Sequence, residues 1–163
     1  LARMLRGGED IKFIARRLVI LASEDIGLAN PTAMVMASSC FQSVQVVGMP
    51  ESRIILSQCV IYLATSEKSN SAYTAINQAL AFVDQTGDLP VPLSLRNAPT
   101  GLMKKMGYGD GYQYAHDYEG NFKSHDFLPE KIQDKKLYDP GSNDREKSIR
   151  KWLKYRWQDK YGY

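Results

Sequence analysis

The sequence has few cysteines and histidines and no long apolar run. Its only cysteines, Cys40 and Cys59, do not form a close Cys-x-x-Cys pair. Chains that depend on disulfides or a structural zinc carry more cysteines at tighter spacing, so we expect two buried, reduced thiols. No apolar run approaches the length of a membrane span, and the run at residues 18–22 is flanked by charged residues. A secretory signal is also missing, so we expect a cytoplasmic protein.

Motifs for nucleotide hydrolysis are missing as well. No Gly-x-x-x-x-Gly-Lys-Ser/Thr loop occurs, and the glycine-rich run at 107–111 is followed by Tyr-Gln-Tyr. A phosphate-binding loop needs a helix N-terminus with Lys-Ser or Lys-Thr at that point. No serine stands in a nucleophile elbow. We therefore expect this chain to have no catalytic residue, no cofactor and no enzymatic activity of its own.

Both histidines precede an aspartate, as His116-Asp117 and His125-Asp126. Such pairs allow one alternative function, a small metal-dependent hydrolase. Metal ligands must converge from rigid elements, whereas these pairs lie in a glycine-containing, aromatic stretch without a third histidine. We expect ordinary hydrogen-bonding contacts and no metal site.

Apolar residues recur at helical spacing up to residue 88, and none of this part alternates with a period of two. The chain opens like the last turn of a helix without an initiating Met, as in a fragment of a longer protein. Capping residues then bound four helices, at 10–27, 30–48, from residue 50, and 69–87. The predicted start signals are Asp10, Asn30-Pro31, Pro50-Glu51 and Ser69 or Asn70; the predicted stops are Gly27, Gly48 and Gly87. Four helices on short loops predict a helical bundle.

The residue composition changes at Leu89. Three prolines between 90 and 99 leave room for one short helix near 100–106, and the glycines at 107–111 predict a loop with space for a short hairpin. A last helix is predicted at 143–160. The fold class is therefore all-α, with a helical domain at 1–88 and a loop-rich C-terminal subdomain at 89–163.

Basic and aromatic residues concentrate in this second part. Residues 1–99 carry eight basic and eight acidic residues, whereas residues 100–163 carry thirteen and ten; both tryptophans and eight of the ten tyrosines follow residue 107. On the last helix, lysines and arginines lie opposite a seam of Ile149, Trp152, Leu153 and Trp157. They are either a solvated face or a set of phosphate contacts beside aromatic rings that stack on bases. The candidate DNA-binding residues are Arg96, Lys104, Lys105, Lys147, Arg150, Lys151 and Lys154, of which Arg96 is favoured for a structural role.

Three blocks of sequence carry a family resemblance. The first runs from Arg16-Arg17-Leu18-Val19 to Ala22-Ser23-Glu24-Asp25-Ile26-Gly27-Leu28-Ala29-Asn30-Pro31, and the second is Lys68-Ser69-Asn70-Ser71-Ala72-Tyr73. The third combines Pro90-Val91-Pro92-Leu93, Leu95-Arg96-Asn97-Ala98-Pro99-Thr100, Leu102-Met103-Lys104 and Gly107-Tyr108-Gly109, followed by Gly111-Tyr112, Tyr114-Ala115-His116-Asp117 and Phe127-Leu128-Pro129. Together they resemble the C-terminal region of the replication-associated recombination protein A family, RarA or MgsA. The final helix matches less closely.

The resemblance implies a helical collar like that of clamp loaders in an AAA+ ATPase related to the Werner-helicase-interacting protein. It implies a DNA-dependent ATPase whose ATP- and magnesium-binding motifs lie in the N-terminal part of the full-length protein. It also implies a homotetramer built through this region, action at stalled replication forks, contact with single-stranded or forked DNA and with single-strand-binding protein, a nucleoid-associated location and no membrane. The remaining alternative is a protein-binding adaptor without DNA contact.

Overall fold

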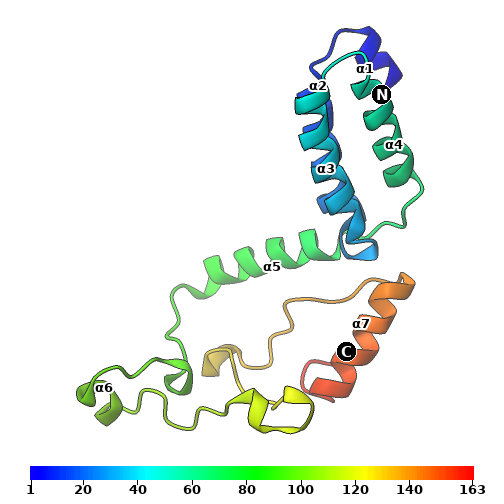
Figure 1. Ribbon diagram of the computed structural model, residues 1–163. Helices are drawn as coiled ribbons and strands as arrows, with labels where there is room; N and C mark the ends of the chain where they lie inside the picture. The colour runs from blue at the N-terminus through cyan, green and yellow to red at the C-terminus, as the bar shows by residue number, and fades with distance from the viewer. The chain divides into compact units, whose positions relative to one another are not determined.

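The computed structural model describes residues 1–163 and contains helices and turns but no β-strand (Figure 1). The predicted all-α class is therefore confirmed. By its contacts the chain divides into unit 1, residues 1–77 and 138–150, and unit 2, residues 78–137 and 151–163. The boundary at residue 88 was drawn from composition alone and stays a prediction. No helix is both long and apolar enough to cross a lipid bilayer.

Unit 1 holds three of the four helices that the apolar spacing assigns to a bundle; the fourth, at 69–87, does not join them as predicted. It contains α1 (Ala2–Arg6), α2 (Ile11–Leu21), α3 (Thr32–Val47) and α4 (Ser52–Ala64), of which α2, α3 and α4 pack side by side (Figure 1). Many of their contact positions are alanine, and small side chains allow close packing of helix axes. The buried core consists of Ile14, Ala15, Ala22, Ile26, Ala33, Ala37, Cys40, Val44, Leu56, Cys59 and Leu63.

The segment between α2 and α3 is shaped by one glycine. A π-helical turn, Ala22–Ile26, and a 3-10 turn, Gly27–Ala29, follow α2. Gly27 has a φ of +48°, and a Cβ built on it would lie 2.6 Å from the carbonyl oxygen of Ser69. Both the left-handed backbone and this close approach require glycine. The predicted stop at Gly27 therefore marks the end of the helical turn and also a contact with the second sequence block.

The predicted helix caps are confirmed at Asp10 and differ at Asn30. The Asp10 carboxylate accepts a hydrogen bond from the backbone N–H of Lys12 at 3.0 Å, as an N-cap does. The Asn30 side chain instead contacts Tyr62 on α4 and Ser66 just after it, and Pro31 occupies the cap position of α3. Asn30 is therefore wrongly predicted as a cap, because its amide binds hydroxyls from the C-terminal end of α4 and the residues that follow it.

The division between the units falls within α5 (Ser71–Thr86) and within α7 (Asp144–Trp157). Unit 2 also contains α6 (Gly101–Lys105) and several 3-10 turns. Thr100 caps α6 by accepting from the N–H of Met103 at 3.3 Å, close to the predicted start.

The short hairpin that the sequence allows in the glycine-rich segment does not form. Gly107, Gly109 and Gly111 have φ angles of +80°, +80° and +74° and lie in successive turns. Strand pairing needs negative φ along the backbone. The N–H of Gly109 instead donates to the carbonyl of Leu93 at 2.8 Å, which closes this segment onto the proline-rich one.

Unit 2 is held together by aromatic rings and cations. The Trp157 ring makes edge contacts with Phe122 at 5.1 Å and Tyr161 at 5.0 Å between centroids. The guanidinium of Arg156 lies 5.1 Å from the centre of the Phe122 ring, and Lys160 pairs with Asp126. Each such contact adds much less to the free energy of unfolding than the burial of a large apolar side chain in a closed core.

Candidate functional site

Arg96 lies in the proline-rich segment, and its side chain makes hydrogen bonds within unit 2. Its Nε donates to the carbonyl of Val91 at 2.7 Å, its Nη1 donates to the Tyr108 hydroxyl at 3.2 Å, and its guanidinium carbon lies 5.0 Å from the centre of the Tyr108 ring. These contacts join the two ends of the third sequence block. They are the structural contacts that the sequence favours for Arg96, and they use donors that a phosphate would need.

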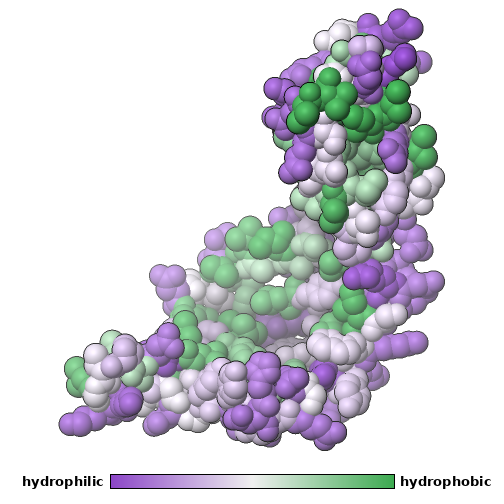
Figure 2. Space-filling view, viewed as in Figure 1, coloured by the Kyte–Doolittle hydropathy of each residue, from purple (hydrophilic) through white to green (hydrophobic).

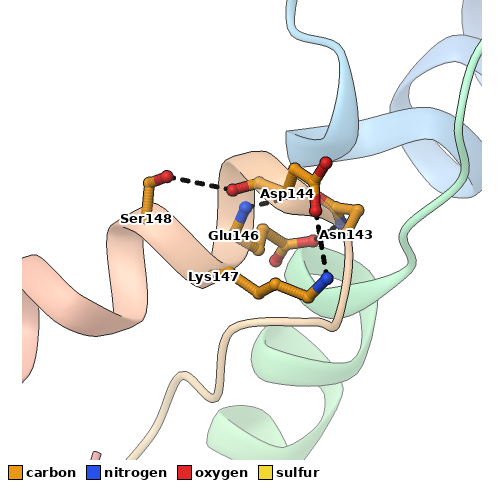
Figure 3. Close-up of polar contacts among 5 residues, drawn as sticks. All are labelled: Asn143, Asp144, Glu146, Lys147 and Ser148. Atoms are coloured by element: carbon orange, nitrogen blue, oxygen red, sulfur yellow. Dashed lines mark hydrogen bonds and ion pairs between the residues drawn. The ribbon is translucent and has the colours of Figure 1, made fainter.

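Two further candidates are paired within unit 1. The Lys147 ammonium lies 3.0 Å from the Asp144 carboxylate (Figure 3). The Arg150 guanidinium lies 3.0 Å from Asp139 and also donates to the carbonyl of Pro140. Contact with a phosphate would have to compete with these carboxylates.

The other four candidates, Lys104 and Lys105 on α6 and Lys151 and Lys154 on α7, all belong to unit 2. Their side chains are exposed and make no hydrogen bond or ion pair with another side chain of the chain. The cations of α6 lie in its last turn, where the helix dipole favours positive charge. The structure therefore separates seven candidates into three that are engaged internally and four that are available to an anion.

The most elaborate polar site surrounds Glu146, a residue that belongs to none of the motifs described above. Its side chain is completely buried. Its carboxylate accepts hydrogen bonds from the Ser71 hydroxyl at 2.5 Å, the Tyr138 hydroxyl at 3.0 Å and the Asn143 amide at 2.5 Å. Asn143 in turn accepts from the N–H of Glu146 at 3.0 Å (Figure 3). This reciprocal Asn-x-x-Glu pair resembles a capping box, except that Glu146 accepts from the side-chain amide of Asn143 and not from its backbone N–H. The Asn-x-x-Glu spacing at the start of a helix is the sequence signal for this residue.

These donors determine the charge state of Glu146. Burial alone raises the pKa of a carboxyl group, but the hydrogen bonds from the Gly141 backbone, Ser69, Ser71 and Asn143 outweigh it and lower the pKa of Glu146 to about 2. A Cβ on Gly141 would lie 2.8 Å from the carboxylate, so glycine gives the backbone access to it. The ionised carboxylate thus joins the start of α7 to the start of α5.

The second sequence block forms the centre of this arrangement. Ser69 donates its N–H to the carbonyl of Asp25 at 2.8 Å, and its hydroxyl accepts from the N–H of Ser71 at 3.2 Å. The Lys-Ser-Asn-Ser element therefore contacts the first block on one side and Glu146 on the other. Its serines act as internal donors and acceptors.

The His-Asp pairs do not converge. His116 packs on Tyr114, with ring centroids 5.1 Å apart, and Asp126 pairs with Lys160. No group of three or more His, Cys, Asp or Glu side chains could hold a metal ion. This dispersal gives no support to the hydrolase alternative.

His125 contributes to a cavity of about 610 Å³ in unit 2, with walls from residues 88–96 and 125–133. Its Nε2 lies 3.1 Å from the Ser94 hydroxyl, and its ring stands edge-on to Phe127. A serine nucleophile also needs a group that orients the histidine and an oxyanion site. The adjacent carboxylate of Asp126 is instead bound to Lys160, so the Ser94–His125 pair is explained as a link between two loops.

The two cysteines lie on facing helices and are free, buried thiols, as predicted. Burial raises the pKa of Cys40, and burial together with the neighbouring Cys40 raises that of Cys59 to about 12. Both groups therefore stay protonated and act as small apolar residues in the core.

Comparison with known proteins gives one family. Residues 1–157 match the family model described as "MgsA AAA+ ATPase C terminal". The chain is 44% identical over 156 residues to Replication-associated recombination protein A of Coxiella burnetii, covering 95% of this chain and 36% of that protein. It is 40% identical to the protein of the same name in Escherichia coli K12, over 91% of this chain and 33% of the relative.

A eukaryotic relative is similar to the same degree. The protein named ATPase WRNIP1 of Dictyostelium discoideum is 40% identical over 152 residues, covering 90% of this chain and 17% of that protein. This chain thus spans about a third or less of the length of these relatives. The resemblance inferred from the three sequence blocks is confirmed.

Proposed function

Because this chain belongs to the MgsA AAA+ ATPase C-terminal family, we propose that it is the oligomerisation and DNA-engaging region of a clamp-loader-like AAA+ ATPase. The parent protein acts in DNA replication, recombination and repair at stalled forks. Relatives named Replication-associated recombination protein A support this proposal. In the parent protein, ATP and magnesium bind to an N-terminal part that this chain does not include, and ATP turnover depends on DNA. Single-strand-binding protein is a partner, and the location is the nucleoid.

The assembly role is supported by the exposed apolar face of α5. Tyr73, Ile76, Leu80 and Val83 recur at intervals of three, four and three residues and are each about half exposed. Figure 2 shows hydrophobic residues along this helix. Asp84 is the only charged residue of α5, so two copies of the stripe meet without repulsion along most of its length. This spacing is that of helices that pair with one another, which favours a second copy of the chain as the occupant.

Light scattering tests the assembly. We expect the chain to be a tetramer, or at least a dimer, at tens of micromolar, and Leu80→Glu to dissociate it because the charge would be buried. Thr74→Glu places the same charge on an exposed position of α5 outside the stripe and should leave the oligomer intact. A strict monomer for the unaltered chain contradicts the assembly role.

The DNA-engaging role is carried by the four lysines of unit 2 without internal partners: Lys104, Lys105, Lys151 and Lys154. A lysine that contacts a phosphate releases a bound counterion, so affinity falls as salt rises. Anisotropy of labelled single-stranded and forked DNA at several salt concentrations measures this slope.

The pairs of lysines provide the variants. Lys104→Ala with Lys105→Ala, and Lys151→Ala with Lys154→Ala, should each weaken binding and reduce the magnitude of the salt slope by about 2. Lys12→Ala removes an exposed lysine of unit 1 and serves as the control. No binding at low salt contradicts the DNA role and leaves the protein-binding adaptor as the function.

A further inference from the structure

The C-terminal half of α7 exposes two large aromatic side chains between lysines. Trp152 is 54% exposed and Tyr155 is 77% exposed. Residues three and four positions apart share a helix face, so Tyr155 lies beside both Trp152 and Lys151. Lys154 is also exposed, but as the immediate neighbour of Tyr155 it lies on the adjoining face of the helix, flanking the rings from the other side of Tyr155. Burying an aromatic ring is strongly favourable, and two rings left in solvent on one helix form a surface suited to a ligand.

The two rings are supported from within unit 2. The guanidinium carbon of Arg156 lies 5.4 Å from the centre of the Trp152 ring and 5.9 Å from that of Tyr155. Arg156 itself stacks on Phe122 at 5.1 Å, and its Nη1 lies close to Gly120, where a Cβ would be 2.9 Å away. An anchored cation behind each ring restrains the side chains while much of their surface stays open. The rings are thus held in place before a ligand arrives, which reduces the entropy lost on binding.

The charge around the rings selects the ligand. Lys151 and Lys154 have no carboxylate partner, whereas the acidic residues Asp144 and Asp139 are paired with Lys147 and Arg150. Asp159 is exposed and lies beyond the end of α7, in the turn that begins at Gln158, where φ is +51°. The face therefore combines flat apolar rings with unneutralised positive charge. A ligand that matches both has negative charges at regular intervals and unsatisfied aromatic faces.

Single-stranded nucleic acid has this chemistry. Its phosphates bind lysines, and its unpaired bases offer ring faces that stack on aromatic side chains. A duplex offers the phosphates alone, because its bases are stacked on one another. We propose that α7 binds single-stranded DNA by stacking unpaired bases on Trp152 and Tyr155 while Lys151 and Lys154 contact the phosphates. This inference rests on the DNA contact proposed above and specifies its chemistry.

Comparison of two polymers with the same backbone tests the stacking. The chain is titrated with oligothymidylate and with an abasic oligonucleotide of equal length, which carries the same phosphates and no bases. We expect oligothymidylate to bind about tenfold more tightly or better, as one or more stacked bases predict. It should also quench tryptophan fluorescence, and in Trp157→Phe the only remaining reporter is Trp152.

Substitution of the rings gives the second readout. Trp152→Ala and Tyr155→Ala should each reduce the preference for oligothymidylate over the abasic polymer, whereas Tyr155→Phe, which keeps the ring, should retain it. Tyr112→Ala removes an exposed tyrosine elsewhere in unit 2 and is the matched control. Circular dichroism verifies that each variant is folded.

The possible failures are distinct. Equal affinity for the two polymers with a normal salt slope overturns the stacking and leaves the DNA contact in place. Duplex DNA bound as tightly as oligothymidylate overturns the preference for unpaired bases. No binding to either polymer at low salt overturns both this inference and the DNA role proposed above.

Discussion

The two units are stabilised in different ways. All fully buried side chains lie in unit 1, where they form the helical core together with Ser52 and Glu146. Unit 2 buries no residue to that extent and depends on aromatic contacts, cations stacked on rings and short backbone turns. Regions with few buried apolar contacts open locally at low free-energy cost. The comparison indicates that unit 1 is the more stable part, and that unit 2 is the part that opens locally at lower free-energy cost.

Truncation of a core residue should cause the largest loss of stability in unit 1. Leu56 on α4 is completely buried, and Leu56→Ala should lower the free energy of unfolding by about 2–5 kcal/mol through lost apolar contacts and the resulting cavity. Urea denaturation followed by circular dichroism measures the change. Ile54→Ala, at a position of the same helix that is 64% exposed, should change stability by far less. Equal effects at the two positions would contradict the location of the core.

Removal of the buried charge tests the polar part of unit 1. Glu146→Gln leaves donors facing a neutral amide, so we expect the free energy of unfolding to fall by about 1–3 kcal/mol. Thermal denaturation against Ser148→Ala, an exposed position of the same helix, gives the difference. A neutral result for Glu146→Gln would mean that the hydrogen bonds from Ser71, Tyr138 and Asn143 do not favour the ionised carboxylate.

Acid titration examines the same group without a large structural change. The folded-state pKa of Glu146, about 2, lies below its ordinary value of 4.5, so the unfolded chain binds a proton first as pH falls. The contribution of Glu146 is therefore complete above about pH 4.5 and is lost progressively as the pH falls toward 2. Denaturation midpoints of the unaltered chain and of Glu146→Gln should converge over this range. A constant difference between them would contradict the lowered pKa.

A substitution in the aromatic cluster should have a smaller and more local effect. Phe122→Leu removes the edge contact with Trp157 and the ring beneath Arg156, which together stabilise unit 2 by about 0.5–1.5 kcal/mol. Hydrogen exchange should accelerate in unit 2 and remain unchanged in the core of unit 1. Tyr112→Leu, at an exposed ring, is the control. Faster exchange throughout unit 1 would show that the two units unfold together.

Most of the helical architecture follows from local sequence. The cap at Asp10, the stops at Gly27 and Gly48, the start at Thr100 and the last helix depend on residues within a few positions of one another. Periodic apolar residues predicted the individual helices for the same reason, but not that only α2, α3 and α4 pack together. The failures are at Asn30, whose amide binds hydroxyls at and beyond the end of α4, and at the glycine-rich segment, where positive φ recurs at every second residue and interrupts any strand.

The candidate site was less accessible to such reasoning. The residue types that bind DNA could be named from composition, but not which of them have an internal partner. Arg96 donates hydrogen bonds to Val91 and Tyr108, whereas Lys151 and Lys154 have no such partner. The difference arises because the path of the chain places a carbonyl, a ring or a carboxylate near one cation and not near another.

Local residue patterns therefore account for the class of fold, the helix boundaries and the family of this protein. The folded chain alone brings Ser71 to Glu146 across 75 positions and leaves Trp152 and Tyr155 in solvent. Helix propensity and capping depend on the dihedral angles of neighbouring residues, so they can be predicted from adjacent residues in the sequence. Burial and pairing depend on which distant segments meet, and this is settled only when the helices pack.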